Sequence, residues 1–400
     1  MKLADRMERI GTETAFEAAA RARALEATGR DVIHLEIGEP DFDTPRHVSE
    51  AAVKALLDDK MTHYPPAPGI APLRAALAAD VKRWKGIEAA PEQVVVTPGA
   101  KPIMFYAMLA LINAGDEVIY PNPGFPIYES MINFSGGKAV PLPLREANDF
   151  RMDVEEVASL VTDRTRMIVT NSPHNPTGSI LTQEDQREIA RIAVEHDLVV
   201  LADEIYGRIL YDGEEHVSIA SLPGMAERTI VLDGFSKTFA MTGWRLGYAI
   251  VPEALAPVYG QLVINTISCA PIWANVGAVE ALRGPQGPMD DMVSEFRARR
   301  DLVVDGLNGI PGIRCLSPKG AFYAFPDISG TGLSGKELAD RLLLESDVCV
   351  LAGTAFGGIA TNHIRISYAN SRENLSKALE RIRGFVEDLP AEAAIAGTAR

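Results

Sequence analysis

The sequence has few cysteines and no long apolar run, and each shortage argues against a class of protein. Its three cysteines, Cys269, Cys315 and Cys349, lie far apart and form no CxxC pair. This spacing argues against a disulfide framework and against a zinc site, and it fits the reducing environment of the cytoplasm. The N-terminal segment is charged throughout, and no apolar stretch reaches the roughly 18 residues of a membrane span. We therefore expect a cytoplasmic protein with no export or membrane segment and no metal.

Basic residues are also in short supply. The 39 Lys and Arg are outnumbered by 54 Asp and Glu, which gives a net charge of -15. Phosphate backbones and anionic lipid surfaces are bound mainly through clustered Lys and Arg, so this charge argues against a nucleic-acid or membrane partner. Aromatic residues make up only 6%, yet a hydrophobic content of 47% in 400 residues is enough for a large buried core. The length predicts about two or three domains.

The middle of the chain alternates between strand-like and helical patterns. Strand candidates are residues 93–97, 117–120, 139–142, 167–170, 198–202, 230–232 and 246–251. Helical stretches such as 102–112 and 184–195 separate several of them. Such alternation is typical of βαβ units, so we predict an α/β large domain with a seven-stranded, mainly parallel sheet.

A second region follows the breaker GPQGP. It contains a long amphipathic helix at 289–307, strands at 321–325, 348–351 and 363–367, and a closing helix at 372–388. We predict that the N-terminal segment joins this region. The large domain would then cover residues 48–287, and a smaller α+β domain would be formed by 1–47 and 288–400, with 389–400 as a mobile tail.

Two charged side chains and a tyrosine follow predicted strands. Lys237 lies in a turn after the β-rich run Thr229–Asp233, whereas Asp203 directly follows an apolar strand and is followed by Tyr206. Open α/β sheets bind ligands at this end of their strands. A lysine amine held there can attack a carbonyl, and a buried carboxylate there needs a cation such as a protonated ligand nitrogen. A lone Ser-Lys pair is more often a solvated surface feature, so only the combination indicates a site.

The segment TPGAK joins a valine-rich strand to a helix and has the features of an anion site. Gly99 permits close approach, and the first N–H groups of the helix and its dipole attract negative charge. Ser236 and Arg245 would add a hydroxyl and a guanidinium to the same anion. Many such loops bind nothing, so this segment is informative only with the others. Asn175 ends a further strand and offers an amide, and its bond to Pro176 is a candidate for the cis form.

Seven segments, in order GEPDF, TPGAK, PNPGF, NPTG, ADEIY, SKTFAMTGWRLGY and IRISYA, together resemble the class I aminotransferases of the aspartate aminotransferase branch. These are pyridoxal-phosphate enzymes of fold type I. The segments span Gly38 to Arg365, so the resemblance covers nearly the whole chain. It implies transamination between an α-amino acid and a 2-oxo acid with pyridoxal 5'-phosphate as cofactor. It also implies a homodimer with shared active sites.

The resemblance assigns roles to the cofactor-binding residues. Lys237 corresponds to the Schiff-base lysine, Asp203 to the partner of the pyridinium nitrogen, and Asn175 and Tyr206 to donors to the ring hydroxyl. Residues at the phosphate would be Gly99, Ala100, Ser236 and Arg245, with Tyr64 reaching the neighbouring subunit's phosphate. Lys101 is a further cofactor-binding candidate. Phe125 falls where the family stacks an aromatic ring on the cofactor.

Substrate binding is assigned in the same way. Gly38, Asn175 and Arg365 correspond to the site of the α-carboxylate, which suits the planar fork of an arginine. Lys101 matches a position that in the aspartate-like branch binds a second carboxylate, which makes aspartate and glutamate candidate substrates. The alternative for Lys101 is a solvated lysine in the first turn of a helix.

Three other interpretations remain. The same fold and cofactor also support β- or γ-elimination, replacement and decarboxylation, for example in secondary metabolism, and the cofactor motifs do not separate these from transamination. A ligand-sensing module fused to a DNA-binding regulator is disfavoured because no basic helix-turn-helix region is present. Gly330–Gly335 matches the dinucleotide pattern GxGxxG, but four residues separate it from the preceding strand, so a loop of the smaller domain is favoured.

Overall fold

A seven-stranded sheet forms the centre of the protein, whose computed structural model describes residues 1–390. Its strands are β2 (Val94–Thr97), β3 (Glu117–Asn122), β4 (Lys138–Pro143), β5 (Thr165–Asn171), β6 (Val199–Asp203), β7 (Thr229–Gly234) and β8 (Gly247–Ile250). They lie in the order β2-β8-β7-β6-β5-β3-β4. Every neighbouring pair is parallel except the two pairs that involve β8. The predicted seven-stranded, mainly parallel sheet is confirmed.

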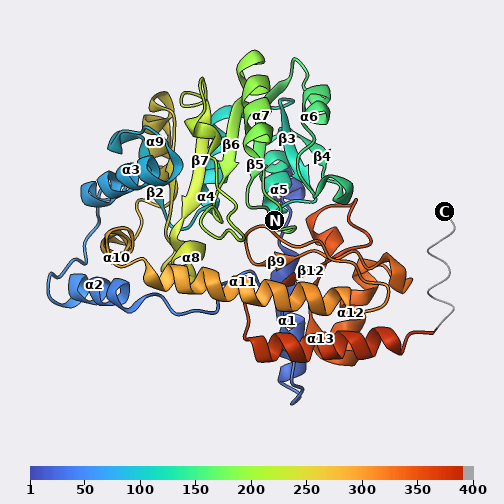
Figure 1. Cartoon of the computed structure of the whole chain (residues 1–400). Coiled ribbons are helices and arrows are strands. Elements are labelled where there is room, and N and C mark those ends of the chain that lie inside the picture. Colours follow the sequence, from blue (N-terminus) through green and yellow to red (C-terminus); the bar gives the residue numbers. More distant parts are fainter. Residues whose placement is uncertain (391–400) are drawn as a thin grey trace.

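Helices cover the sheet, as Figure 1 shows. They are α3 (Ala71–Lys85), α4 (Lys101–Leu111), α5 (Ile127–Ser135), α6 (Val154–Leu160), α7 (Gln183–Glu195), α9 (Ala256–Thr266) and α10 (Ile272–Arg283). All residues of β2, β7 and β8 are buried. Strands covered on both faces read as continuous apolar runs, which is why these strands are visible in the sequence.

A second group of strands lies in the C-terminal part. β9 (Tyr323–Ala324), β11 (Leu351–Ala352) and β12 (Ile364–Ser367) form an antiparallel sheet in the order β11-β12-β9. The helices of this part are α11 (Gly287–Asn308), α12 (Gly335–Ser346) and α13 (Arg372–Glu387). Figure 1 shows α11 running beneath the large sheet toward α12 and α13.

The N-terminal segment contacts this C-terminal part. After α1 (Thr14–Glu26), the short strand β1 (Ile33–His34) pairs in parallel with β10 (Val348–Cys349). On this basis we propose that 1–47 and 288–400 form a smaller domain beside 48–287. Helix α2 (Arg46–Leu57) crosses that boundary and packs on α10. Of the predicted mobile tail 389–400, residues 391–400 lie outside the described part of the chain.

Helix starts follow from local sequence. The Thr182 hydroxyl accepts the N–H of Asp185, whose carboxylate accepts the N–H of Thr182 in return, and α7 begins between them. The Ser371 hydroxyl caps α13 in a similar way by accepting the N–H of Asn374. Each such cap satisfies N–H groups that have no partner within the helix. Among residues 1–390, no helix is both long and apolar enough to cross a membrane.

The chain turns sharply after β7. Gly234 ends the strand, the four-residue helix α8 (Phe235–Thr238) follows, and the chain then returns as β8. An added Cβ at Gly234 would lie 3.1 Å from the Cα of Gly247 on β8, a tight contact that would push the two strands slightly apart. This turn leaves Lys237 at the end of the sheet.

Candidate active site

A cavity of about 450 Å³ lies where the large sheet meets the C-terminal strands. Eleven of the thirteen predicted site residues line it: Gly38, Ala100, Lys101, Phe125, Asn175, Asp203, Tyr206, Ser236, Lys237, Arg245 and Arg365. The carboxyl ends of β5, β6 and β7 contribute to its wall, as expected for an open α/β sheet. Gly99 and Tyr64 do not line the cavity, and their positions are described below.

Lys237 presents its amine inside this cavity. Nζ donates a hydrogen bond to the backbone oxygen of Gly38 over 2.5 Å. Burial lowers the pKa of Lys237 to about 8, and the positive charges of Arg365 and Arg245 act in the same direction. The amine is therefore partly neutral near physiological pH. A Cβ at Gly38 would lie 2.0 Å from the hydroxyl oxygen of Tyr323, so only glycine fits beside the lysine.

Asp203 lies buried at the end of β6. Its Oδ2 accepts the Tyr128 hydroxyl at 2.6 Å, and its Oδ1 accepts the N–H of Ile205 at 3.3 Å. Burial raises the pKa of Asp203 to about 6, although the bond from Tyr128 lowers it. Within residues 1–390 this carboxylate contacts hydrogen-bond donors but forms no ion pair. It is thus a buried acid that lacks a cation.

Arg365, on β12, is a buried base that forms no ion pair with any residue of the described part of the chain. Its Nη1 donates to Oδ1 of Asn175 at 3.2 Å, and its Nη2 donates to the backbone oxygen of Glu36. The guanidinium lies over the rings of Tyr323 and Phe356, with 4.6 and 4.8 Å to their centroids. Its Nε is buried without a hydrogen-bond partner in the described structure. Burial lowers the pKa of Arg365, because removing the guanidinium from water disfavours its charged form.

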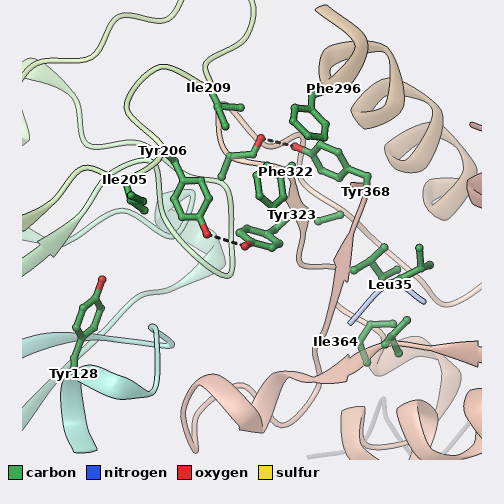
Figure 2. Packing of buried hydrophobic residues seen from close by; sticks show 14 of the residues in the cluster. Leu35, Tyr128, Ile205, Tyr206, Ile209, Phe296, Phe322, Tyr323, Ile364 and Tyr368 are labelled. Carbon is green, nitrogen blue, oxygen red and sulfur yellow. Dashed lines mark hydrogen bonds between the residues drawn. The ribbon is translucent and has the colours of Figure 1, made fainter. Parts of the chain in front are cut away.

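Two tyrosine hydroxyls meet at the cavity. The hydroxyl oxygens of Tyr206 and Tyr323 are 2.7 Å apart, and Figure 2 shows the two side chains pointing toward each other. Burial raises the pKa of both phenols, so both stay protonated. Tyr323 and Tyr128 were not predicted as site residues. The available signal was weak, because it was only a hydroxyl within an apolar strand for Tyr323 and a tyrosine shortly after PNPGF for Tyr128.

Three loops converge at one side of the cavity. Ala100 precedes the first turn of α4, Ser236 belongs to α8, and Arg245 follows the chain reversal. A Cβ at Gly99 would lie 2.2 Å from Nη2 of Arg245, so the predicted glycine is needed where the arginine crosses this loop. Hydroxyl, guanidinium and helix N-terminal N–H groups together suit a phosphate.

Lys101 is partly solvated, with 44% of its side chain exposed, and it also contacts an acidic side chain. Its Nζ lies 2.6 Å from Oε1 of Glu13, and the rings of Phe16 and Phe125 lie 5.9 and 5.7 Å away. Tyr64 lies outside the cavity with 90% of its surface exposed.

Other sequence hypotheses can be placed as well. The Asn175–Pro176 bond is cis, as hypothesised, and so are Asn122–Pro123 and Ser172–Pro173. The GxGxxG segment Gly330–Gly335 lies between β9 and the start of α12 and does not line the cavity. Among residues 1–390, no cluster of His, Cys, Asp and Glu is suited to a metal ion.

Comparison with known proteins identifies relatives along the whole chain. The model of the family "Aminotransferase class I and II" matches residues 30–382. The aromatic-amino-acid aminotransferase 2 of Thermococcus litoralis is 41% identical over 97% of this chain and 99% of its own. The aspartate aminotransferase of Pyrococcus abyssi is 43% identical over 90% of this chain and 92% of its own. The crystal structure of the aspartate aminotransferase from Rhizobium meliloti superposes with a TM-score of 0.93 at 36% identity, covering 98% of this chain and 100% of that one.

Proposed function

Since this chain belongs to the class I and II aminotransferases and transfers an amino group between an amino acid and a 2-oxo acid, we propose that it does so with pyridoxal 5'-phosphate bound in the cavity. One observation carries the proposal. The same cavity is lined by a buried carboxylate and a buried guanidinium that form no ion pair within residues 1–390, and by an amine of lowered pKa. The cofactor's ring nitrogen, its aldehyde and the carboxylate of an amino acid supply the three missing partners.

The donor set of the cavity fits this cofactor. Asp203 suits a protonated ring nitrogen, because a cation there would relieve the cost of its burial. Ser236, Arg245 and the N–H groups at the start of α4 suit the phosphate. Phe125 also lines the cavity, and we assign it to the face of the ring. The fit extends from one end of the cofactor to the other.

When bound, pyridoxal 5'-phosphate supplies an electron sink for the charge that develops at the substrate's α-carbon. Asp203 would keep the ring nitrogen protonated by its negative charge. Lys237 would hold the aldehyde end, and its amine, once the substrate's amine has displaced it, would move the α-proton as general base and general acid. A pKa of about 8 suits both roles, because both protonation states are populated near neutral pH.

Arg365 would bind the α-carboxylate. A planar guanidinium matches a carboxylate through two parallel hydrogen bonds, and the rings of Tyr323 and Phe356 hold its plane. Asn175 orients this arginine, because its amide oxygen already accepts a hydrogen bond from Nη1. The remaining NH₂ group of Asn175 and the hydroxyl of Tyr206 are then the donors that we assign to the cofactor's ring oxygen.

We also propose a homodimer with shared active sites and a cytoplasmic location. Tyr64 is 90% exposed and lies outside its own cavity, which suits a hydroxyl that reaches the phosphate site of a second subunit. The few, widely spaced cysteines suit a reducing compartment.

The test is incubation of the cofactor-loaded protein with a panel of amino acids. The absorbance of the cofactor is followed, and products are identified by mass spectrometry. Release of the matching 2-oxo acid, with the amino group left on the cofactor, is the expected result. Loss of a side-chain fragment or of CO₂ instead would reject transamination in favour of elimination or decarboxylation.

A further inference from the structure

Glu13 and Lys101 form an ion pair on the wall of the cavity. Glu13 comes directly before α1, and Lys101 is the first residue of α4. Their charged atoms are 2.6 Å apart. The Glu13 side chain is only 13% exposed, so its carboxylate is largely shielded from water. No local pattern in the sequence joins these two segments.

The pair lies within reach of the groups that handle the substrate. Burial lowers the pKa of Lys237, and the negative charge of Glu13 opposes this change. Burial also lowers the pKa of Arg365, and Glu13 opposes that change as well. The negative charge of Glu13 therefore acts electrostatically on Arg365, at the proposed carboxylate site, and on the amine of Lys237.

We propose that Glu13 determines substrate choice by neutralising Lys101, so that the enzyme favours uncharged side chains over a second carboxylate. The inference rests on the function proposed above, because it assigns the wall formed by Glu13, Phe16, Lys101 and Phe125 to the substrate's side chain. Lys101 alone would attract a dicarboxylic substrate. With Glu13 beside it, the wall has no net charge.

Electrostatics and packing both support this reading. A second carboxylate that binds Lys101 must break or share the ion pair, and the displaced carboxylate of Glu13 then repels it. An uncharged side chain leaves the pair intact. It also meets the rings of Phe16 and Phe125, which flank the ammonium of Lys101 at 5.9 and 5.7 Å from their centroids. A charge-assisted hydrogen bond corresponds to about tenfold or more in affinity, which sets the size of the expected effect.

The first experiment measures binding and does not depend on turnover. Calorimetry compares succinate with butanoate on the cofactor-loaded protein, because these two ligands differ by one carboxylate. We expect the parent protein to bind butanoate at least as tightly as succinate. We expect Glu13→Gln to shift the ratio of the two affinities toward succinate by about fivefold or more. A parent that binds succinate more tightly, or a smaller shift in the variant, overturns the proposal, and the parent measurement decides alone if the variant does not fold.

The second experiment measures kcat/KM for aspartate, leucine and arginine. Glu13→Gln should raise the aspartate-to-leucine ratio, whereas Lys101→Gln should raise the arginine-to-leucine ratio because it leaves Glu13 unpaired. Glu17→Gln is the matched control, since Glu17 is exposed, lies in the helix that Glu13 precedes and does not line the cavity. The control should leave both ratios unchanged. If both test variants turn over amino acids with unchanged ratios of kcat/KM, Glu13 does not determine substrate choice, and the proposed transamination is unaffected.

A different failure would concern the function itself. If no amino acid is turned over while succinate binding responds to Glu13→Gln as expected, the proposed function is wrong and the charge selectivity of the cavity is supported.

Discussion

Lys237 donates a hydrogen bond from its amine to the backbone oxygen of Gly38, across 2.5 Å. The lysine comes from the turn after β7, and the glycine comes from the segment between β1 and α2. The bond therefore connects the large sheet with the segment that pairs with the C-terminal part. It orients an amine whose pKa is lowered to about 8, so that the amine is held in place and is partly neutral.

The first prediction concerns this amine. Lys237→Ala should abolish covalent attachment of pyridoxal 5'-phosphate, because no other amine takes the place of Nζ at the end of β7. Borohydride reduction of the loaded parent followed by peptide mapping should label Lys237. A label on another lysine, Lys101 included, would show that the assignment is wrong.

The second prediction concerns catalysis by Asp203. Asp203→Asn should still bind the cofactor but lose several orders of magnitude in turnover, because a neutral amide does not keep the ring nitrogen protonated. Single-turnover kinetics with one amino acid measures the effect. A loss of less than about tenfold would mean that another group holds the ring nitrogen.

The third prediction concerns the stability of the cofactor-free protein. Burial raises the pKa of Asp203 from 3.8 to about 6, so the folded protein keeps a proton that the unfolded chain releases between these values. The associated stability is present below about pH 4 and is lost as the pH rises through about 6, by about 3 kcal/mol. Asp203→Asn stays neutral and should be the more stable protein at pH 7.5, with the gap closing toward pH 4. Urea unfolding at both pH values measures the gap, and a gap independent of pH would contradict the prediction.

The fourth prediction concerns the hydroxyl pair of Tyr206 and Tyr323. Tyr323→Phe removes one neutral hydrogen bond beside Arg365, and kcat/KM should fall by roughly 2- to 13-fold. Tyr368→Phe is a suitable control, because Tyr368 is also fully buried but its hydroxyl contacts Tyr211 and Ala321 instead. An equal loss in both variants would indicate a general packing effect.

The fifth prediction concerns the proposed dimer. Lys237→Ala and Tyr64→Ala should each be inactive, yet a mixture refolded together should regain activity, because a hybrid dimer contains one site with both residues intact. With random pairing, half of the dimers are hybrids, so about a quarter of the parent activity is expected. A parent protein that is fully active as a monomer at assay dilution would refute the shared site.

Local sequence was enough for the part of the site that sits on single strands. A valine-rich or apolar run followed by a breaker predicts a strand, and parallel strands bring their carboxyl ends to one edge of a sheet. This is why Asp203 and Lys237 were expected together, and both line the cavity. Strands β2, β7 and β8 were visible because burial on both faces leaves a continuous apolar run.

Only the tertiary structure decided which side chains contact each other. Tyr128 and Asp203 are 75 positions apart, and Tyr206 and Tyr323 are 117 apart, so no periodicity or motif pairs them. Lys101 is the sharpest case. TPGAK left open whether Lys101 is a solvated lysine or a cation for a second carboxylate. Its side chain is 44% exposed, and the fold also brings Glu13 to 2.6 Å from it, which no sequence pattern indicates. A side chain's charge is set by its own residue type, but the field around it depends on segments that only the packed fold brings together.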